Sequence, residues 1–362
     1  MTQNPSKVAI LGAGAIAYAT AAILCRDGHD VTLWSPSGRR TEKIATGERL
    51  IAKGALVGQF HPRISTSCAE ALAGVDAVVI AVPGYAHRHV LDAAAPHLRR
   101  EQVVIFSSHI SLSALYLDKL LRERGVVLPI CALGTTLATG RQQPDLNSVT
   151  IGSIRARVDV AIVPEQETAR GLRVCRSLFG DRFVLRPNIL AVSLSNINPE
   201  THLAMVLCNL TRMEIGENWG QWKHVTPAVS RLLEELDAER LAIAKSFGLT
   251  VRTIHEHFHL SYNLPMGPLS EMLKPLQQET KDVKGPTTLD ARYVTEDVPF
   301  GLVPIVRLAE LAGVAAPLHE NGVRLLSALY GRNFVEENDI LPELGALSVP
   351  MLVGESARDS RL

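Results

Sequence analysis

The sequence predicts an α/β protein, with a doubly wound parallel sheet in the N-terminal half followed by an all-α second domain. Two observations predict this fold class. In the first half, short β-rich runs alternate with stretches in which apolar residues recur every three or four positions, as in β-α-β units. After about residue 187 the β-rich runs end and the helical period continues alone. The length of 362 residues is enough for two domains of ordinary size.

Strands of the first domain are expected where five β-rich runs stand between helical stretches: KVAIL (7–11), DVTLW (30–34), DAVVIAV (76–82), QVVIFS (102–107) and VVLPICAL (126–133). Further strands are expected near SVTIGS and DVAIVP. A last one is expected at FVLR (183–186), after the helical stretch ETARGLRVCRSLFG.

The second domain contains a helix with clear boundaries over TPAVSRLLEELDAERLAIAKSFG (226–248). Thr226 is suited to the N-cap, Pro227 to the first turn and Gly248 to the end of this helix. The segments FGLVPIVRLAELAGV and LHENGVRLLSALYG continue the helical period.

Composition excludes several classes of partner. The 37 lysines and arginines balance the 37 aspartates and glutamates, so no net field attracts nucleic acid or an anionic membrane. The five cysteines are scattered and lack C-x-x-C spacing, which is typical of a reducing compartment and favours neither disulfides nor a thiolate zinc site. No signal-peptide pattern opens the chain, and no apolar run approaches the roughly 20 residues of a spanning helix. We therefore expect a cytoplasmic protein that binds neither nucleic acid nor a membrane.

The first strand is followed by the glycine pattern Gly12-x-Gly14-x-x-Ala17. Between a strand and a helix, the first glycine makes the tight turn, the second lets the backbone approach a pyrophosphate, and the small third residue lets the helix pack closely. The N–H groups of the helix N-terminus would face the phosphates. We predict that Gly12, Gly14, Ala15, Ile16 and Ala17 bind a dinucleotide; the alternative is a glycine turn without a ligand. The expected parts of the chain are a dinucleotide-binding Rossmann domain (1–187), an α-helical substrate and catalytic domain (188–350) and a C-terminal tail (351–362).

The end of the second strand, LWSPSGRR, distinguishes between the two nicotinamide dinucleotides. An NAD-binding protein usually places Asp or Glu there, where the carboxylate accepts from the ribose 2′-OH. This chain has Ser35 and Ser37 instead, followed by Arg39 and Arg40. Hydroxyls and guanidinium forks suit a 2′-phosphate. NADP(H) is therefore favoured as cofactor; NAD(H), with the arginines as solvated loop charges, is the alternative.

Two later strands supply further residues to the predicted cofactor crevice. AVPG (81–84) ends one of them, and we expect Val82 and Pro83 to line the nicotinamide side. His109, in SSHISLS, follows the next parallel strand. We expect His109 to face the crevice, as a substrate contact and as an alternative acid.

The stretch SLSNINPETHLAM contains the residue on which function depends, His202. Many dehydrogenases with a helical second domain use a lysine on the first helix after the nucleotide-binding domain, but no lysine occurs between Leu185 and Gln221. Asn198 and His202 stand there instead, four residues apart and on one face of a helix. From these residues alone, a packed core histidine is the favoured interpretation, with a proton donor as the alternative.

Three segments give the sequence a specific resemblance: SNINPETHLAMVLCNLTRMEIGENW, DAERLAIAKSFGL (237–249) and RYVTEDVPFGLVP (292–304). With the glycine pattern and the domain order, they resemble the octopine/nopaline (opine) dehydrogenase family over nearly the whole chain to about residue 330. Enzymes of this family reductively condense an α-keto acid with the amino group of an amino acid, using NAD(P)H. The chain departs from the family at His202-Leu203, where members often carry His-Pro.

The resemblance implies a catalytic pair, because the family pairs a histidine of the helical domain with an aspartate. By motif position these are His202 and Asp297. A histidine with an ordinary pKa of about 6.5 can donate and recover protons near neutrality, and a carboxylate on its other ring nitrogen fixes the tautomer. The alternative for Asp297, which precedes Val298-Pro299, is a helix N-cap.

The substrate carboxylates require cations, and Arg292, five residues before Asp297, is one candidate, with a surface ion pair as the alternative. Asn198 is a further predicted substrate contact, and Arg141 a weaker one. Trp219 and Trp222 either shape a pocket for the amine side chain or pack in the core.

HEHFH (255–259) matches the zinc-protease pattern H-E-x-x-H. No third ligand is evident nearby, so we expect a histidine-rich helix and no metal site.

The sequence thus predicts an NAD(P)-dependent oxidoreductase acting on CH–NH bonds, namely an NADP(H)-dependent opine-type dehydrogenase. Its substrates would be a small α-keto acid and an amino acid or amine, and a homodimer is expected. Two alternatives stay open. One is a reductase of a keto acid or ketose phosphate without amine, resembling ketopantoate or glycerol-phosphate dehydrogenases. The other is a non-catalytic NADP(H) sensor.

Overall fold

The computed structural model describes residues 5–278, 282–345, 348 and 352. These residues form two compact units, of which the first ends at Ser193 and the second begins at Leu194. The sequence predicts the change from alternating strands and helices to helices alone at about residue 187. Helix α7 (Ile189–Ser193) belongs with the first unit because it packs on strands β8 and β11. Except for Leu352, the predicted tail (351–362) lies outside the described residues.

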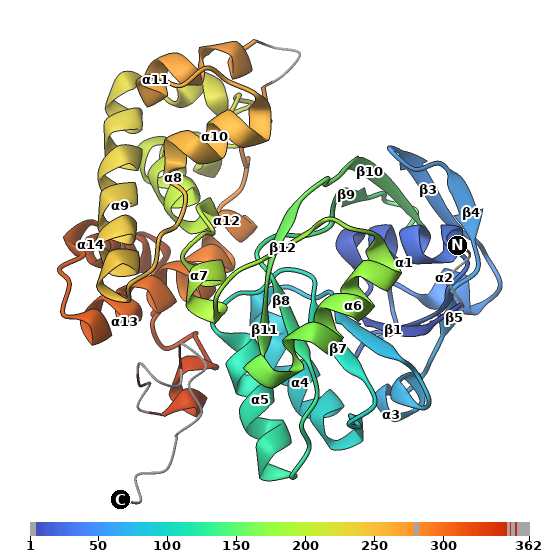
Figure 1. Cartoon of the computed structure of the whole chain (residues 1–362). Coiled ribbons are helices and arrows are strands. Elements are labelled where there is room, and N and C mark those ends of the chain that lie inside the picture. Colours follow the sequence, from blue (N-terminus) through green and yellow to red (C-terminus); the bar gives the residue numbers. More distant parts are fainter. Residues whose placement is uncertain (1–4, 279–281, 346–347, 349–351, 353–362) are drawn as a thin grey trace, which may run out of the picture. The chain divides into compact units, whose positions relative to one another are not determined.

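The first unit is organised around an eight-stranded sheet in the order β12-β11-β8-β7-β6-β1-β2-β5 (Figure 1). Every neighbouring pair is parallel except β11 and β8, which are antiparallel. The Rossmann-type fold class is therefore confirmed, with one antiparallel join that the sequence pattern did not predict. The strands are β1 (Lys7–Leu11), β2 (Asp30–Trp34), β5 (Arg63–Ile64), β6 (Ala77–Ile80), β7 (Val103–Phe106), β8 (Ile130–Leu133), β11 (Val158–Val163) and β12 (Phe183–Leu185).

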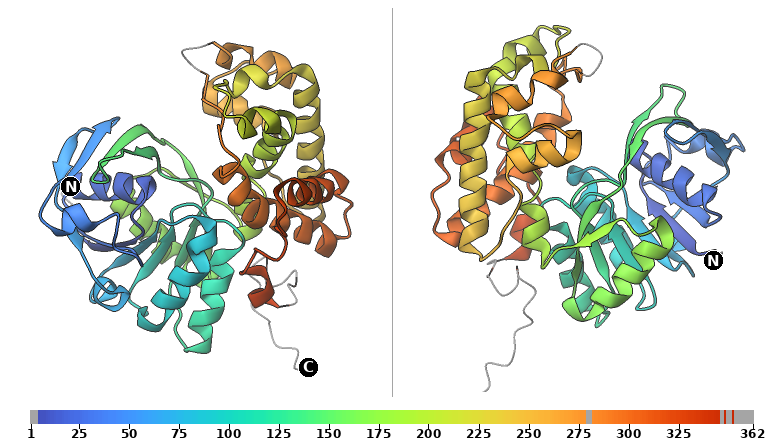
Figure 2. Two further views of the ribbon diagram at one scale, coloured as in Figure 1. Left: turned by 180° about the vertical axis from the view of Figure 1, so that it is seen from behind. Right: turned by 45° about the horizontal axis from the view of Figure 1, so that its top comes forward.

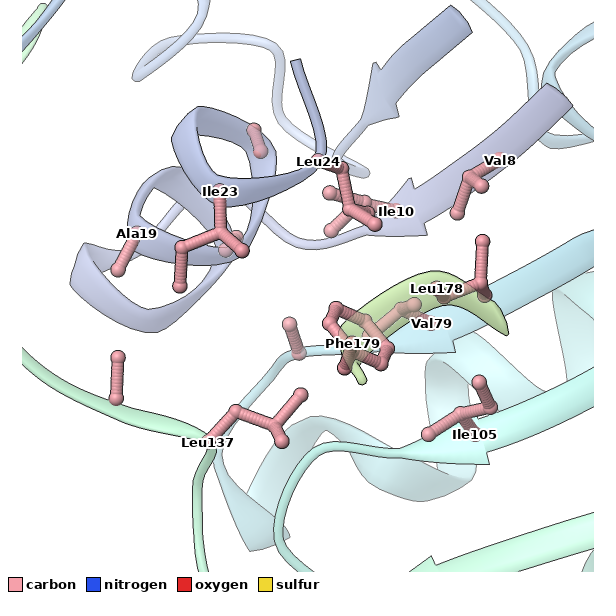
Figure 3. Close-up of a cluster of buried hydrophobic side chains, with 14 of the residues drawn as sticks. Val8, Ile10, Ala19, Ile23, Leu24, Val79, Ile105, Leu137, Leu178 and Phe179 are labelled. Atoms are coloured by element: carbon pink, nitrogen blue, oxygen red, sulfur yellow. The ribbon is translucent and has the colours of Figure 1, made fainter. Parts of the chain in front are cut away.

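Alternate residues of the central strands face opposite sides of the sheet and are buried on both. Figure 3 shows one of these sides, where Val8 and Ile10 of β1 lie among side chains of α1 and α6. The helices of this unit are α1 (Ala15–Arg26), α2 (Glu42–Ala45), α3 (Cys68–Leu72), α4 (His87–Ala94), α5 (Ser113–Glu123), α6 (Thr168–Phe179) and α7.

A second, four-stranded sheet has the order β4-β3-β10-β9 and lies against α1 (Figure 2). Its strands are β3 (Leu50–Gly54), β4 (Gly58–Phe60), β9 (Ala138–Gln142) and β10 (Ser148–Ile154). Only β10 is predicted by the sequence, because the other three runs are short and mix glycine with polar residues. The approach is close at β9, where a Cβ on Gly140 would lie 3.0 Å from the Ala15 carbonyl oxygen. This sheet therefore brings β9 to the start of α1.

Among the described residues of the second unit, the regular elements are all helices, as predicted, joined by loops and with one isolated bridge between Gly220 and Lys284. Its core surrounds α9 and α8 and contains both Trp219 and Trp222, which are 2% and 5% exposed. Core packing is thus the role of the two tryptophans. The elements are α8 (Asn198–Glu214), α9 (Pro227–Ser246), α10 (Ile254–Tyr262), α11 (Leu269–Met272), α12 (Arg292–Thr295), the π-helical turn η6 (Val298–Leu302), α13 (Val303–Ala312) and α14 (Pro317–Tyr330).

The predicted boundaries of the long helix are confirmed. The Thr226 hydroxyl accepts from the Val229 N–H, Pro227 is the first residue of α9, and Gly248 follows its end with φ +70°. In α10, the HEHFH segment forms a capping box: the Glu256 carboxylate accepts from the Thr253 N–H at 2.8 Å. His255 contacts Glu234 and His259 contacts the Leu264 carbonyl, so these side chains are explained by local structure. None of the described helices is both long enough and apolar enough to cross a membrane.

Candidate active site

The glycine turn between β1 and α1 has a geometry that requires glycine. Gly12 adopts φ +140°, and a Cβ there would lie 2.3 Å from the Ala81 carbonyl oxygen. Gly14 occupies the N-cap position of α1 without a side-chain cap, so the first N–H groups of the helix have no capping partner from it. Ala17 is fully buried. These are the features that a backbone site for pyrophosphate needs.

The four predicted residues follow the end of β2, where the Trp34 carbonyl accepts from the Gly12 N–H of the turn at 2.7 Å. Ser37, Arg39 and Arg40 are exposed, whereas the hydroxyl of Ser35 is buried and has no hydrogen-bond partner among the described residues. The Arg40 carbonyl accepts from the Tyr18 hydroxyl at 2.5 Å. A Cβ on Gly14 would lie 3.8 Å from the Arg40 guanidinium, which places this cation beside the phosphate-binding turn.

Gln142 is a residue of this region that the sequence interpretation missed. It lies on β9, where its Oε1 accepts from the Arg40 guanidinium at 3.3 Å and its amide lies 3.5 Å from the Ala13 carbonyl. The pairing of β9 with β10 carries it there from more than a hundred residues away in sequence, so no local signal could have predicted it. Arg141, its neighbour on β9, is exposed.

Val82 and Pro83 follow β6, as predicted, and a buried histidine holds their backbone. His87 lies 3.2 Å from the Val82 carbonyl through Nε2 and 2.7 Å from the Ser113 hydroxyl through Nδ1. Burial lowers the pKa of His87 to about 4. The ring is therefore neutral at pH 7, which suits a structural link to the segment after β6.

His109 is 2% exposed and lies 3.4 Å from the Ser193 hydroxyl through Nδ1, with no hydrogen-bond partner for Nε2 among the described residues. Burial, followed by the charge of His87, lowers the pKa of His109 to about 3. A ring that holds no second proton near neutrality is a poor general acid. The lowered pKa of His109 therefore argues against its expected role as an alternative acid.

In the second unit, two residues 95 positions apart in sequence form one pair. The Nδ1 of His202, on α8, lies 2.6 Å from Oδ2 of Asp297. Both side chains are about 15% exposed. Although Asp297 is at the N-cap position of η6, its side chain makes no capping bond. The carboxylate therefore serves the imidazole instead, and Nε2 of His202 has no partner among the described residues.

Two glycines allow η6 and α14 to approach α8, the helix that carries His202. A Cβ on Gly301, in η6, would lie 2.6 Å from Cγ of Pro199, and a Cβ on Gly322, in α14, would lie 2.6 Å from Leu203. Leu203 is thus the residue that fills the space over Gly322, at the position where family members often carry proline. Pro199 lies in the first turn of α8, so it begins the helix and does not bend it.

Tyr293 is a second site residue that the sequence interpretation missed. Its ring stacks on the imidazole of His202 with a centroid separation of 3.6 Å and an interplanar angle of 10°. The Tyr293 hydroxyl donates to Oε1 of Gln221 at 2.7 Å. The signal available in sequence was its place in RYVTEDVP, one residue after Arg292 and four before Asp297.

Arg292 and Asn198, the predicted substrate contacts of this unit, are both exposed at the surface. Arg292 is an exposed side chain whose Nε donates to the Glu296 carboxylate at 2.5 Å, which is the ion pair named as the alternative. Asn198, the first residue of α8, is exposed, and its backbone N–H donates to Asn196.

A buried ionic cluster lies two residues from His202 in sequence. The fully buried Arg240 contacts the carboxylates of Glu200 and Asp237 and donates to the carbonyls of Leu194 and Arg252. Burial is the largest influence on Glu200 and, against the charge of Arg240, raises its pKa to about 8. The cluster joins the start of α8 to α9 and to the segment before α10.

Comparison with known proteins matches both units of the chain. Residues 185–330 match the family described as NAD/NADP octopine/nopaline dehydrogenase, alpha-helical domain. Residues 7–109 match the NAD-dependent glycerol-3-phosphate dehydrogenase N-terminus. The chain is 32% identical over 343 residues to an opine dehydrogenase of Arthrobacter sp. (strain 1C), covering 93% of this chain and 94% of that protein.

Solved structures share the fold. An octopine dehydrogenase with NADH and L-arginine has a TM-score of 0.82 at 17% identity, covering 98% of this chain and 99% of that one. An NADP⁺-bound yersinopine dehydrogenase has a TM-score of 0.73 at 19% identity, covering 97% and 98%. The extent of the Arthrobacter match, together with the helical-domain match, identifies the family: this chain belongs to the octopine/nopaline (opine) dehydrogenases and is an NAD(P)-dependent oxidoreductase.

Proposed function

We propose that the protein is an NADP(H)-dependent opine dehydrogenase that joins a small α-keto acid to the amino group of an amino acid or amine. The observation that carries this proposal is the 2.6 Å contact between His202 Nδ1 and Asp297 Oδ2, which leaves Nε2 of the imidazole open. An acid–base group of this kind is what the removal of a carbonyl oxygen as water requires. The same two residue types are the pair that the family implies.

In this proposal the protonated His202 donates a proton from Nε2 to the carbonyl oxygen as the amine attacks, and it takes a proton from the amine nitrogen, so that the oxygen becomes a hydroxyl group. It then donates this proton to the hydroxyl, which leaves as water as the carbon–nitrogen double bond forms, and solvent restores the proton of His202. Asp297 holds the Nδ1 proton and stabilises the imidazolium that forms between these steps. When bound, the nicotinamide supplies the hydride that reduces the carbon–nitrogen double bond.

The cofactor would be held by the first unit. The glycine turn and the uncapped start of α1 suit the pyrophosphate. Ser35, with its unpartnered buried hydroxyl, and the exposed Ser37 and Arg39 suit a 2′-phosphate. Val82 and Pro83 would face the nicotinamide. Residues 35–40, after β2, contain no carboxylate that could accept a hydrogen bond from a ribose 2′-OH. This absence supports NADP(H) over NAD(H) as cofactor.

Arg292 and Asn198 are proposed to hold the substrate carboxylates. Arg292 uses Nε and Nη2 on Glu296, so Nη1 is the part of its fork that is left for a substrate. His109 is proposed as a neutral contact through Nε2. A homodimer is proposed on the analogy of other helical second domains.

The experiment follows NADPH oxidation with pyruvate alone and with pyruvate plus pools of amino acids and simple amines. We expect turnover that requires both substrates, is lost in His202→Ala, and is retained in the matched control His255→Ala. The His255 side chain, in α10, pairs with Glu234 of α9. His255→Ala therefore removes a histidine of the same unit without changing the pair of His202 and Asp297. Turnover with the keto acid alone would instead identify a hydroxy-acid reductase and overturn the proposal.

Cofactor preference is tested by the ratio of kcat/KM with NADPH to that with NADH, in the wild type and in Arg39→Ala. The control is Arg26→Ala, a surface arginine of α1 that pairs with Asp27. We expect Arg39→Ala to lower the ratio roughly tenfold, since a charge-assisted contact to phosphate is lost. An unchanged ratio in Arg39→Ala would contradict the assignment of Arg39 to the 2′-phosphate.

A further inference from the structure

Tyr293 and Asp297 restrain the His202 ring in different ways. Asp297 makes one hydrogen bond in the plane of the imidazole, at Nδ1. A single bond of this kind leaves the ring free to pivot about the line from Nδ1 to Oδ2. Tyr293 lies flat on the face of the ring, 3.6 Å away between centroids and 10° from parallel. A flat partner at van der Waals distance blocks the pivot that the hydrogen bond allows.

Tyr293 can restrain His202 only if its own ring is held in place, and a hydrogen bond to Gln221 holds it. Its hydroxyl donates to Oε1 of Gln221, a side chain that is only 4% exposed. The backbone of Gln221 is fixed in turn, because its N–H donates to the Val283 carbonyl at 2.6 Å and Gly220 forms a bridge with Lys284. The ring of Tyr293 is therefore anchored at its far end to paired backbone.

A proton-donating role for Tyr293 fits this geometry poorly. The hydroxyl proton is already given to Gln221. Burial, followed by the negative charge of Asp297, raises the pKa of Tyr293, so the phenol stays neutral near pH 7. What Tyr293 offers to His202 is the face of its ring.

The face of an aromatic ring carries partial negative charge and attracts a cation. Imidazole becomes a cation when it holds both ring protons. The imidazolium that the proposed condensation forms at His202 would therefore lie against the face of Tyr293 and beside the carboxylate of Asp297.

We propose that Tyr293 is a positioning residue for His202: it fixes the plane of the imidazole, aims Nε2 at the substrate and stabilises the imidazolium. Gln221 is the anchor of Tyr293. This inference rests on the proposed function for its effect on catalysis, but the stacking itself can be measured without any activity.

The test compares three variants. Tyr293→Leu removes the ring, Tyr293→Phe keeps the ring and removes the bond to Gln221, and Tyr330→Leu is the matched control in the same unit. Two readouts are taken: steady-state kcat together with the KM of NADPH, obtained by varying NADPH at saturating co-substrates, and the NMR signal of the His202 ring C–H groups in protein with ¹³C-labelled histidine. His202→Gln assigns that signal by removing it. Thermal unfolding checks that each variant is folded.

In Tyr293→Leu we expect kcat to fall roughly tenfold to a hundredfold, which is less than the loss of about a hundredfold to ten-thousandfold for removal of an acid–base group, because the imidazole is still present; the KM of NADPH should not change. The His202 ring signal should move downfield, because the shielding by the stacked ring is lost. Tyr293→Phe should keep the upfield position and most of kcat, and Tyr330→Leu should match the wild type in both.

A His202 signal that stays in place in Tyr293→Leu overturns the inference, and so does an unchanged kcat in an active enzyme. If the wild type shows no condensation with any substrate pool, the proposed function fails. The ring signal then still decides whether Tyr293 holds His202.

Discussion

At the scale of single residues, the site depends on the charge of Asp297. Asparagine in its place has the same shape, but its amide is neutral and can present NH₂ to His202 Nδ1, which favours the wrong tautomer. We expect Asp297→Asn to lower kcat at least a hundredfold, since general acid–base catalysis contributes roughly that much or more. The KM of NADPH should not change, because the proposed cofactor residues are in the first unit. Steady-state kinetics measure both.

One kinetic result for Asp297→Asn would contradict this prediction. If Asp297 were only a helix cap, Asp297→Asn would leave kcat within a few-fold of wild type, because asparagine caps helices as well as aspartate does. The absence of a side-chain capping bond at this position argues against that outcome.

At the scale of elements, the approach of η6 to α8 sets the distance between His202 and Asp297, the proposed catalytic pair. Pro199 is a rigid ring in contact with Gly301, and a Cβ on Gly301 would lie 2.6 Å from it. We expect Gly301→Ala to destabilise the protein by about 1–3 kcal/mol, as overpacking of a core usually does. It should also lower kcat, since the displaced element begins directly after Asp297. Denaturant unfolding and kinetics measure the two effects.

Pro199→Ala is the partly compensating change for Gly301→Ala, because it removes Cγ, which would lie 2.6 Å from the new methyl group, and keeps Cβ, which would lie 2.9 Å away. The double variant should recover part of the lost stability, so that the two effects are not additive. Strict additivity would show that the close approach of these two residues is not the cause.

The ionic cluster at the start of α8 predicts a dependence of stability on pH. Burial raises the pKa of Glu200 to about 8 from an unfolded value of 4.5. Between these pH values the unfolded chain has released a proton that the folded chain keeps. The contribution of Glu200 to the free energy of unfolding is therefore complete below pH 4.5 and falls as the pH rises towards 8, by at most about 1.4 kcal/mol per pH unit.

Glu200→Gln tests this dependence, because glutamine resembles the protonated acid and its Oε1 can still accept from Arg240. We expect the free energy of unfolding of the wild type, relative to Glu200→Gln, to fall between pH 5 and pH 8 in urea titrations. A relative stability that rises with pH would mean that Glu200 is ionised in the folded protein.

At the scale of the whole molecule, two separate hydrophobic cores underlie the two units. The proposed cofactor contacts all belong to the first unit. NADPH at about 100 times its Kd should therefore raise the free energy of unfolding of that unit by about 2.7 kcal/mol. Calorimetry should show the first unit's transition moving upwards, while the second unit's transition stays in place.

Tryptophan fluorescence identifies the two transitions, because Trp34 lies in the first unit and Trp219 and Trp222 lie in the second. Trp34→Phe leaves reporters in the second unit alone. A cofactor-dependent rise of the transition seen in Trp34→Phe would contradict the assignment of the cofactor to the first unit.

The sequence by itself determined those features that a few neighbouring residues encode. The turn at Gly12 requires glycine because of its backbone conformation, and α9 begins at Thr226 and Pro227 because of capping chemistry. Seven strands of the eight-stranded sheet were predictable from the same kind of local pattern, but the two-residue strand β5 and the antiparallel pairing of β8 with β11 were not. The pairing of His202 with Asp297 was predictable from the family resemblance.

Only the tertiary structure decided how distant segments meet. The short, partly polar strands β3 and β9 gain stability from pairing with β10, so their own residues carry little β signal, and Gln142 could not be predicted beside Arg40. The stacking of Tyr293 on His202 and the bond from Tyr293 to Gln221 likewise join segments far apart in the chain. Such contacts arise from the packing of whole elements, where shape and burial outweigh any preference that a single residue expresses locally.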